Sequence, residues 1–156
     1  MTTMNAIENV VYKDRVLAVI VRARALSELK ASGNKMTFAT PDHFPFQMGI
    51  HARPKGDLIP AHFHNPFPEL KNLPVQEFFF VKSGKVKIDL FDERENDAKV
   101  SGFIAEAGDT VLLNSGHGMI FLEDTELIEL KQGPYRGKNE EKRFVAVVNG
   151  RAGGKQ

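Results

Sequence analysis

Two histidines separated by one residue, His62 and His64, open the stretch "HFHNPFPELKNLPVQE". On an extended strand alternate side chains lie on one face, so the two imidazoles can reach the same point. The same stretch supplies two carboxylates, Glu69 and Glu77. Imidazole and carboxylate groups bind zinc, iron, nickel and manganese alike. The spacing therefore indicates a site for one divalent metal ion and leaves open both its identity and the glutamate that completes it.

The two glutamates differ in the segments that carry them. Glu69 lies in "NPFPELKNLP", whose prolines cannot donate to a strand ladder, so we interpret 65–76 as a loop inserted at the mouth of the site. Glu77 begins "EFFFV" and would share a strand face with Phe79 and Val81. A carboxylate among such neighbours is costly unless a cation or hydrogen bonds satisfy it. We therefore predict Glu77 as the ligand; the alternative is a strand residue that faces solvent.

Short apolar or alternating runs, broken by Gly, Pro, Asn and Asp, make up most of the chain. Such runs at intervals of roughly 8–12 residues predict an all-β sandwich or barrel. Only 26–31 favours a helix, and the polar tail 150–156 is expected to be frayed. Because no linker or repeat interrupts the pattern, we expect one domain over 1–156. The expected strands are 15–23, 35–40, 46–54, 57–64, 75–82, 85–91, 99–106, 109–114, 117–123, 126–132 and 143–149.

The histidine pair and Glu77 lie in a pattern that resembles the first motif of the cupins. Gly56 is followed by five residues and then His62-Phe63-His64, and Glu77 is followed by six residues and then Gly84. The family usually places three or four residues between the second histidine and the glutamate, whereas this chain has 12. Glu69 has the standard gap after His64, but the position seven residues after it is Gln76 and not glycine.

The second cupin motif is matched in part by "GDTVLLNSGHGMIF", which begins at Gly108. Asn114 replaces the usual proline, Gly116 fits, and Met119 stands where the family has its histidine. His117 is two residues earlier and would share a strand face with Met119, so we predict His117 as the remaining ligand. The alternative is that His117 caps the turn and the site has only three ligands.

The resemblance covers roughly 46–132 and implies a fold and a cofactor. It implies an all-β cupin jelly roll, a double-stranded β-helix barrel with at most short helices. It also implies one divalent metal ion (Zn, Fe, Ni or Mn) bound by three histidines and a glutamate: His62, His64, Glu77 and His117. The segments "KSGKV" and "KQGPY" resemble small single-domain cupins associated with sugar or surface-polysaccharide pathways.

Four further residues are candidates for contact with a small molecule. On the expected strand 46–54, His51 and Arg53 share one face and would meet an anionic or hydroxylated ligand. In the basic segment 131–144, Tyr135 and Arg136 follow a Gly-Pro turn signal and would close over a ligand. The alternative for both pairs is a solvated face or loop.

Composition limits the classes of partner and compartment. The net charge of +1 gives no reason to expect nucleic acid or a membrane as partner. The absence of cysteine excludes disulfides and thiol chemistry. The start "MTTMNAIENVVYKD" has no basic segment followed by an apolar run, so we expect no secretory signal and a cytoplasmic location. The apolar strands "EFFFV" and "RVLAVIV" favour a homodimer.

Three functions fit these observations, and the sequence does not choose among them. The first is a metal-dependent enzyme acting on a small sugar-like or acidic molecule, as an oxygenase, decarboxylase or isomerase. The second is a binding or sensing protein without catalysis. The third is a metal-free sugar isomerase or epimerase that uses histidine as a base. The sequence alone assigns no catalytic residue.

Overall fold

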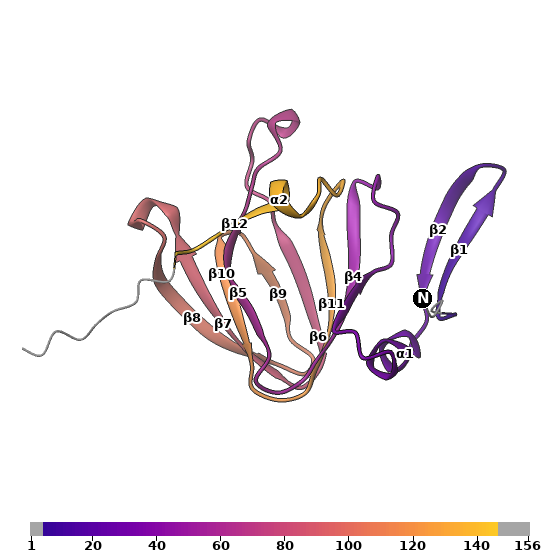
Figure 1. Ribbon diagram of the computed structural model, residues 1–156, viewed down its shortest axis with the longest axis horizontal. Helices are drawn as coiled ribbons and strands as arrows, with labels where there is room; N and C mark the ends of the chain where they lie inside the picture. The colour runs from indigo at the N-terminus through magenta and orange to yellow at the C-terminus, as the bar shows by residue number, and fades with distance from the viewer. Residues whose placement is uncertain (1–4, 147–156) are drawn as a thin grey trace, which may run out of the picture.

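Two five-stranded antiparallel sheets form the body of the protein in a computed structural model, which describes residues 5–146 (Figure 1). One sheet has the order β12-β5-β10-β7-β8 and the other β3-β4-β11-β6-β9. The strands are β3 Met36–Phe38, β4 Phe46–Arg53, β5 Leu58–His64, β6 Glu77–Ser83, β7 Lys85–Asp92, β8 Ala98–Glu106, β9 Thr110–Leu113, β10 Gly116–Phe121, β11 Thr125–Gln132 and β12 Lys142–Phe144.

The pairing of the strands follows a nested order. The first of the eight strands from β4 to β11 pairs with the last, the second with the seventh, the third with the sixth and the fourth with the fifth. This is the order of a jelly roll, so the predicted fold class is confirmed. At the predicted turn between β6 and β7, Gly84 has a φ of +85°, and a Cβ there would lie 2.3 Å from the carbonyl oxygen of Asp124.

Alternation along the strands builds the core between the sheets. On β6 the buried residues alternate with more exposed ones, so that Phe79 and Val81 face inward and Phe78 faces outward. The buried cluster fills one end of the barrel and consists of Phe79, Val81, Val86, Ile88, Ala105, Leu113, Met119, Phe121 and Leu127.

The N-terminal region lies beside the barrel. Strands β1 (Ile7–Tyr12) and β2 (Arg15–Val21) form a separate antiparallel hairpin that stands apart from the two sheets (Figure 1). Helix α1 (Ala25–Ala31) buries Ala25, Leu26 and Leu29 in a second apolar cluster with Ile50 of β4. The helix prediction at 26–31 is therefore confirmed, whereas β1 was missed.

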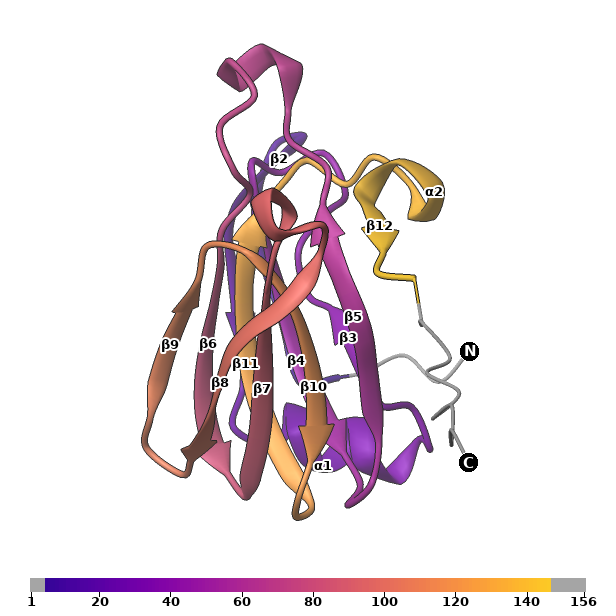
Figure 2. The same ribbon diagram turned by 90° about the vertical axis from the view of Figure 1, so that its left-hand side faces the viewer.

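The opposite end of the barrel is covered by chain segments that the strand pattern did not predict. The segment between β5 and β6 contains the 3₁₀ turn η1 (Pro68–Leu70) and projects beyond the end where helix α2 (Lys138–Glu141) lies (Figure 1, Figure 2). A second 3₁₀ turn, η2 (Glu93–Glu95), follows β7. In place of the predicted strand 143–149, the structure has the shorter strand β12, which begins one residue earlier. Residues 147–149 and the tail 150–156 lie outside the described residues. Within 5–146, no helix has the length and apolar character needed to span a membrane.

Candidate metal centre

The four predicted metal ligands meet inside the barrel, below the end that α2 covers. His62 and His64 belong to β5, Glu77 is the first residue of β6, and His117 is the second residue of β10. His117 lies directly opposite His62 in the β5–β10 pairing, although the two strands belong to different hairpins. At the next position, Gly118, strands β5 and β10 approach closely, because a Cβ there would lie only 3.1 Å from the backbone of Ala61.

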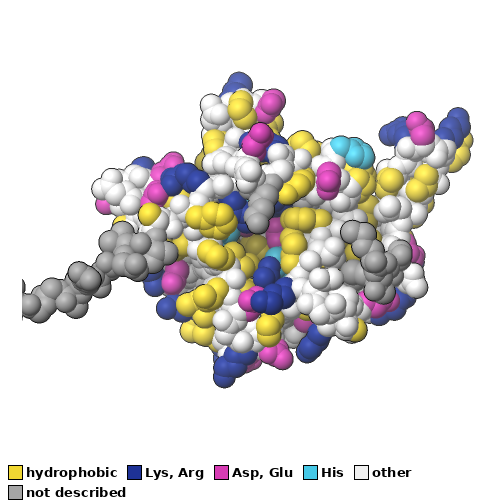
Figure 3. Space-filling view, in the orientation of Figure 1, with side chains coloured by type: hydrophobic (Ala, Val, Ile, Leu, Met, Phe, Trp, Pro, Cys, Tyr) yellow, Lys and Arg dark blue, Asp and Glu magenta, His cyan; other side chains and the backbone are white. Residues whose placement is uncertain are grey.

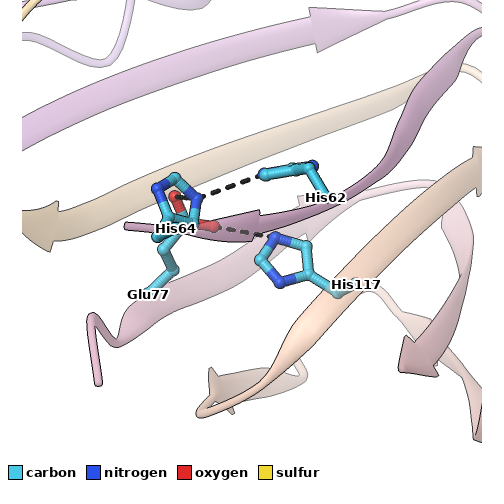
Figure 4. Close-up of side chains that lie close together, drawn as sticks. All are labelled: His62, His64, Glu77 and His117. Carbon is cyan, nitrogen blue, oxygen red and sulfur yellow. Dashed lines mark hydrogen bonds and ion pairs between the residues drawn. The ribbon is translucent and has the colours of Figure 1, made fainter. Parts of the chain in front are cut away.

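The ligand atoms of these side chains lie within 4.8 Å of one another (Figure 4). His64 Nε2 is 2.8 Å from Glu77 Oε1, and His117 Nε2 is 2.9 Å from Glu77 Oε2. His62 Nε2 is 3.1 Å from His64 Nε2. All four side chains are buried, so the groups face one another and not bulk water.

Backbone contacts fix the orientation of two of the imidazoles. His62 Nδ1 lies 2.8 Å from the carbonyl oxygen of Pro60, and His117 Nδ1 lies 3.0 Å from that of Ser115. A carbonyl oxygen can only accept, so each Nδ1 donates its hydrogen there and each neutral ring turns the Nε2 lone pair inward. A lone pair of His117 then faces a carboxylate oxygen of Glu77, which is favourable only when a cation, either a proton or a metal ion, lies between them.

The pKa values at the cluster reflect the same crowding. Burial, reinforced by the charge of Lys142, lowers the pKa of His62 to about 3, so this imidazole is neutral at ordinary pH. Burial alone would raise the pKa of Glu77, but in the metal-free protein, where a proton lies between the groups, hydrogen bonds from His117 and His64 outweigh burial and hold the pKa well below its usual value. A neutral imidazole beside an ionised carboxylate is the protonation state that a metal ion requires of its ligands. The donor set therefore fits a divalent ion.

The nested strand order defines the fold type, and the cluster lies inside it on β5, β6 and β10. The chain has the cupin fold. No protein-family model matches the sequence, and no curated protein matches it either.

Solved structures with similar folds are cupin-type proteins. KdgF from a Halomonas species is 18% identical, with a TM-score of 0.48, over 65% of this chain and 80% of its own. A cupin described as RmlC-like from Desulfovibrio desulfuricans is 16% identical, with a TM-score of 0.45, over 62% of this chain and 79% of its own. An oxalate oxidase is 18% identical, with a TM-score of 0.49, over 65% of this chain and less than half, 46%, of its own length.

A cavity of about 300 Å³ adjoins the cluster inside this cupin barrel. Three of the four predicted ligands, His62, Glu77 and His117, form part of its wall. The face of the molecule that Figure 3 displays has a hollow in its middle. Histidine and charged side chains lie inside the hollow, and hydrophobic side chains lie around it. Its size lies at the lower end of the range for small-molecule sites.

Three of the four residues predicted to contact a small molecule line this cavity, namely His51, Arg53 and Tyr135. Arg53 donates to His51 Nδ1 at 3.3 Å, and His51 Nε2 lies 2.5 Å from Glu129 Oε2. Because Arg53 has no acceptor atom, the hydrogen of the His51 ring lies on Nε2 and is donated to Glu129.

Arg136 lies outside the cavity. Its guanidinium stacks 3.8 Å from the centre of the Phe67 ring and donates to the carbonyl oxygens of Asn65 and Pro66. Glu69 is also separate, because it is exposed on η1 and lines a groove on the outer face of the barrel. The structure thus brings Glu77, and not Glu69, to the three histidines.

Sequence reasoning missed four charged residues of the cavity wall: Glu129 and Lys131 on β11, Glu141 at the end of α2, and Lys142 on β12. Lys131 Nζ lies 2.6 Å from Glu141 Oε2, and both side chains are buried. Burial lowers the pKa of Lys142. For β11 the signal was present, because Glu129 and Lys131 continue the inward alternation that begins at Leu127. For the segment after β11 the sequence has no such periodicity.

Proposed function

We propose that this chain is a metal-binding cupin that takes a small polar molecule into the cavity beside one divalent ion held by His62, His64, Glu77 and His117. The observation that carries the proposal is the convergence of three imidazoles and an ionised carboxylate on one buried point. A bound divalent ion supplies Lewis-acid or oxygen chemistry and polarises an oxygen atom of a bound molecule. The chain is a single cupin domain in this proposal.

The residues around the cluster have separate tasks in this function. The carbonyl oxygens of Pro60 and Ser115 hold two imidazoles in the orientation that turns Nε2 inward. Glu129 is the group placed to hold a proton beside a bound molecule, because it is buried in the cavity wall and His51 fixes one of its oxygens. Tyr135 supplies a phenol group at the rim.

The test is a metal titration of matched variants. Glu77→Gln removes the only carboxylate of the cluster, and we expect zinc and manganese affinities at least about 100-fold below those of the parent protein, beyond the loss typical of outer-shell changes. Glu69→Gln is the control with the same chemical change, and its affinities should match the parent. Equal losses in the two variants, or no binding by parent protein purified without chelator or affinity tag, would contradict the proposal.

A second candidate function is a metal-free isomerase or epimerase, and the buried His51–Glu129 pair is the observation that favours it. A carboxylate that orients an imidazole is a common arrangement for a general base. Here, however, Nδ1 of His51 accepts from Arg53, so a substrate would have to displace that contact first. Turnover of a sugar-nucleotide panel by chelator-treated protein would favour this candidate, and turnover that requires added metal would reject it.

A homodimer in the cytoplasm stays a proposal. It is supported by an apolar groove on the outer face of the barrel, where Phe46, Phe78, Leu112 and Leu130 are partly or largely exposed. Exposed Val11 and Leu17 on the β1–β2 hairpin add to the apolar surface. Light scattering that gives a particle of 17.4 kDa at micromolar concentration would contradict the dimer.

A further inference from the structure

Lys142 differs from every other charged residue of the cavity wall. The others each have a partner: Arg53 with Asp57, Lys131 with Glu141, Glu129 with His51, and Glu77 with His64 and His117. Among the side chains that the structure describes, none is recorded in a hydrogen bond or ion pair with the Lys142 ammonium, and the carboxylates of Glu77, Glu129 and Glu141 act on it only from a distance. An ammonium group that is partly withdrawn from water without a partner is costly, and a bound anion would offset that cost.

The backbone holds Lys142 firmly at the cavity. In the β5–β12 pairing Lys142 lies opposite His64, one of the proposed metal ligands. The preceding residue, Glu141, is anchored by Lys131 and by the backbone N–H of Arg136, and its carbonyl oxygen accepts from Asn65 N at 2.9 Å. On the other side, Val145 N donates to the carbonyl oxygen of Ala61 at 2.9 Å. The backbone that carries Lys142 is therefore ordered before a ligand binds, and only the side chain itself has to be immobilised.

The charges of the cavity also favour an anion. The Lys131–Glu141 pair sums to zero, and Asp57 is shared between Arg53 and Lys35, so these groups leave no negative charge in excess. A divalent ion is balanced by Glu77 together with Glu129, so the positive charge of Lys142 is left in excess. A neutral sugar would leave that charge without a counterion, whereas a monoanion would neutralise it.

We propose that Lys142 is the residue that selects the ligand, by binding the carboxylate of a small polar acid taken into the cavity beside the metal centre. This inference rests on the proposed function, because it assigns a ligand class to the same site. It favours small carboxylates over neutral sugars of similar size. Lys142 is then a specificity-determining residue and not a metal ligand.

The experiment compares L-lactate with L-lactamide, its neutral amide, by calorimetric titration of zinc-loaded protein at low salt. We expect the parent to bind lactate at least about tenfold more tightly than lactamide, because a charge-assisted hydrogen bond is stronger than a neutral one. In Lys142→Met, lactate affinity should fall at least about tenfold and lactamide affinity should change little. Lys142→Arg, which keeps the charge, should retain the preference for lactate.

Lys82→Met is the matched control, since Lys82 is exposed on β6, pairs with Glu126 and lies outside the cavity; it should bind both probes as the parent does. Unchanged lactate affinity in Lys142→Met, or no discrimination by the parent, overturns the inference. Should Lys142→Met fail to fold, lactate affinity is measured on Lys142→Gln instead. A fall in Lys142→Gln, together with the preference of the parent for lactate over lactamide, then supports the inference, and an unchanged affinity overturns it. A zinc titration of every variant is read separately: absence of zinc binding by the parent refutes the metal centre, while normal zinc binding with equal affinity for both probes refutes only the role of Lys142.

Discussion

The two ends of the barrel interior are built from the same strand faces but contain opposite chemistry. Toward the closed end the inward positions are apolar and pack against one another, whereas toward the end that α2 covers they are imidazole, carboxylate or ammonium groups. The inward series are Phe121, Met119 and His117 on β10, Val81, Phe79 and Glu77 on β6, and Leu127, Glu129 and Lys131 on β11.

This difference separates what alternation determines from what it does not. Period-two alternation places every one of these residues inside, so burial alone does not distinguish a core residue from a site residue. The apolar end stabilises the fold through the area that it removes from water, at about 25 cal/mol per Å². At the polar end each buried charge costs free energy unless a partner is present, and the partners come from other elements of the chain.

The largest expected effect comes from two neighbouring inward positions of β10. Met119→Ala leaves a cavity in the apolar cluster and should lower the free energy of unfolding by about 2–5 kcal/mol, with zinc affinity unchanged in the folded protein. His117→Ala removes one of four ligands and should weaken zinc binding by more than about 100-fold. Urea unfolding and zinc titration of both variants give the four values.

The distinction between an apolar end that stabilises the fold and a polar end that binds metal is wrong if His117→Ala keeps its zinc affinity or Met119→Ala loses it. A His117→Ala protein that binds zinc as the parent does would leave a site of three ligands, which was the alternative interpretation of the second motif. A large loss of zinc affinity in Met119→Ala would mean that the apolar end positions the ligands directly, and the two ends would then not be separable.

The sequence predicted those parts of the molecule that depend on local pattern. Strand alternation and turn residues gave the strands from β3 to β11, and the proline content of 65–76 separated Glu69 from Glu77. Groups held by long-range contacts were not predictable in the same way. Arg136 was expected over the cavity, yet its guanidinium is held by the Phe67 ring and by two backbone carbonyls outside it. No alternation of apolar and polar residues around Lys142 predicts that its side chain faces the cavity. The position of Lys142 is fixed instead by contacts of α2 and β12 with β5 and β11.

The next effect in size concerns the buried ion pair between Lys131 and Glu141. Removing one partner leaves an uncompensated buried charge, so Lys131→Met should lower the free energy of unfolding by about 3 kcal/mol or more. The double variant Lys131→Met/Glu141→Gln removes both charges and keeps an acceptor for the N–H of Arg136, so it should recover most of that loss. Urea unfolding measures both, and a double variant as unstable as the single one would show that packing and not charge decides.

The smallest expected effect is the pH dependence of the metal-free protein, which reports the polar end alone. The pKa of His62 is lowered by burial from its ordinary 6.5 to about 3 in the folded state. Between these two values the unfolded chain binds the extra proton and the folded protein does not, so stability rises with pH over this window and is lost as the pH falls through it. The slope contributed by this single group is at most about 1.4 kcal/mol per pH unit.

The contribution of His62 to this pH dependence is isolated by His62→Asn. The side-chain amide of asparagine can still donate to the carbonyl oxygen of Pro60, but it does not gain a proton in this pH range. The measurement uses chelator-treated protein between pH 4.5 and 6, above the ordinary pKa of the Glu77 carboxyl. The free energy of unfolding of the variant should rise less steeply with pH than that of the parent, by the slope that corresponds to about one bound proton. Met119→Ala is the control from the apolar end, and it should shift the whole profile downward without changing its slope. A parent and a His62→Asn variant with parallel profiles would show that His62 is not held neutral, and the polar end would then lack the desolvated imidazole on which its metal affinity depends.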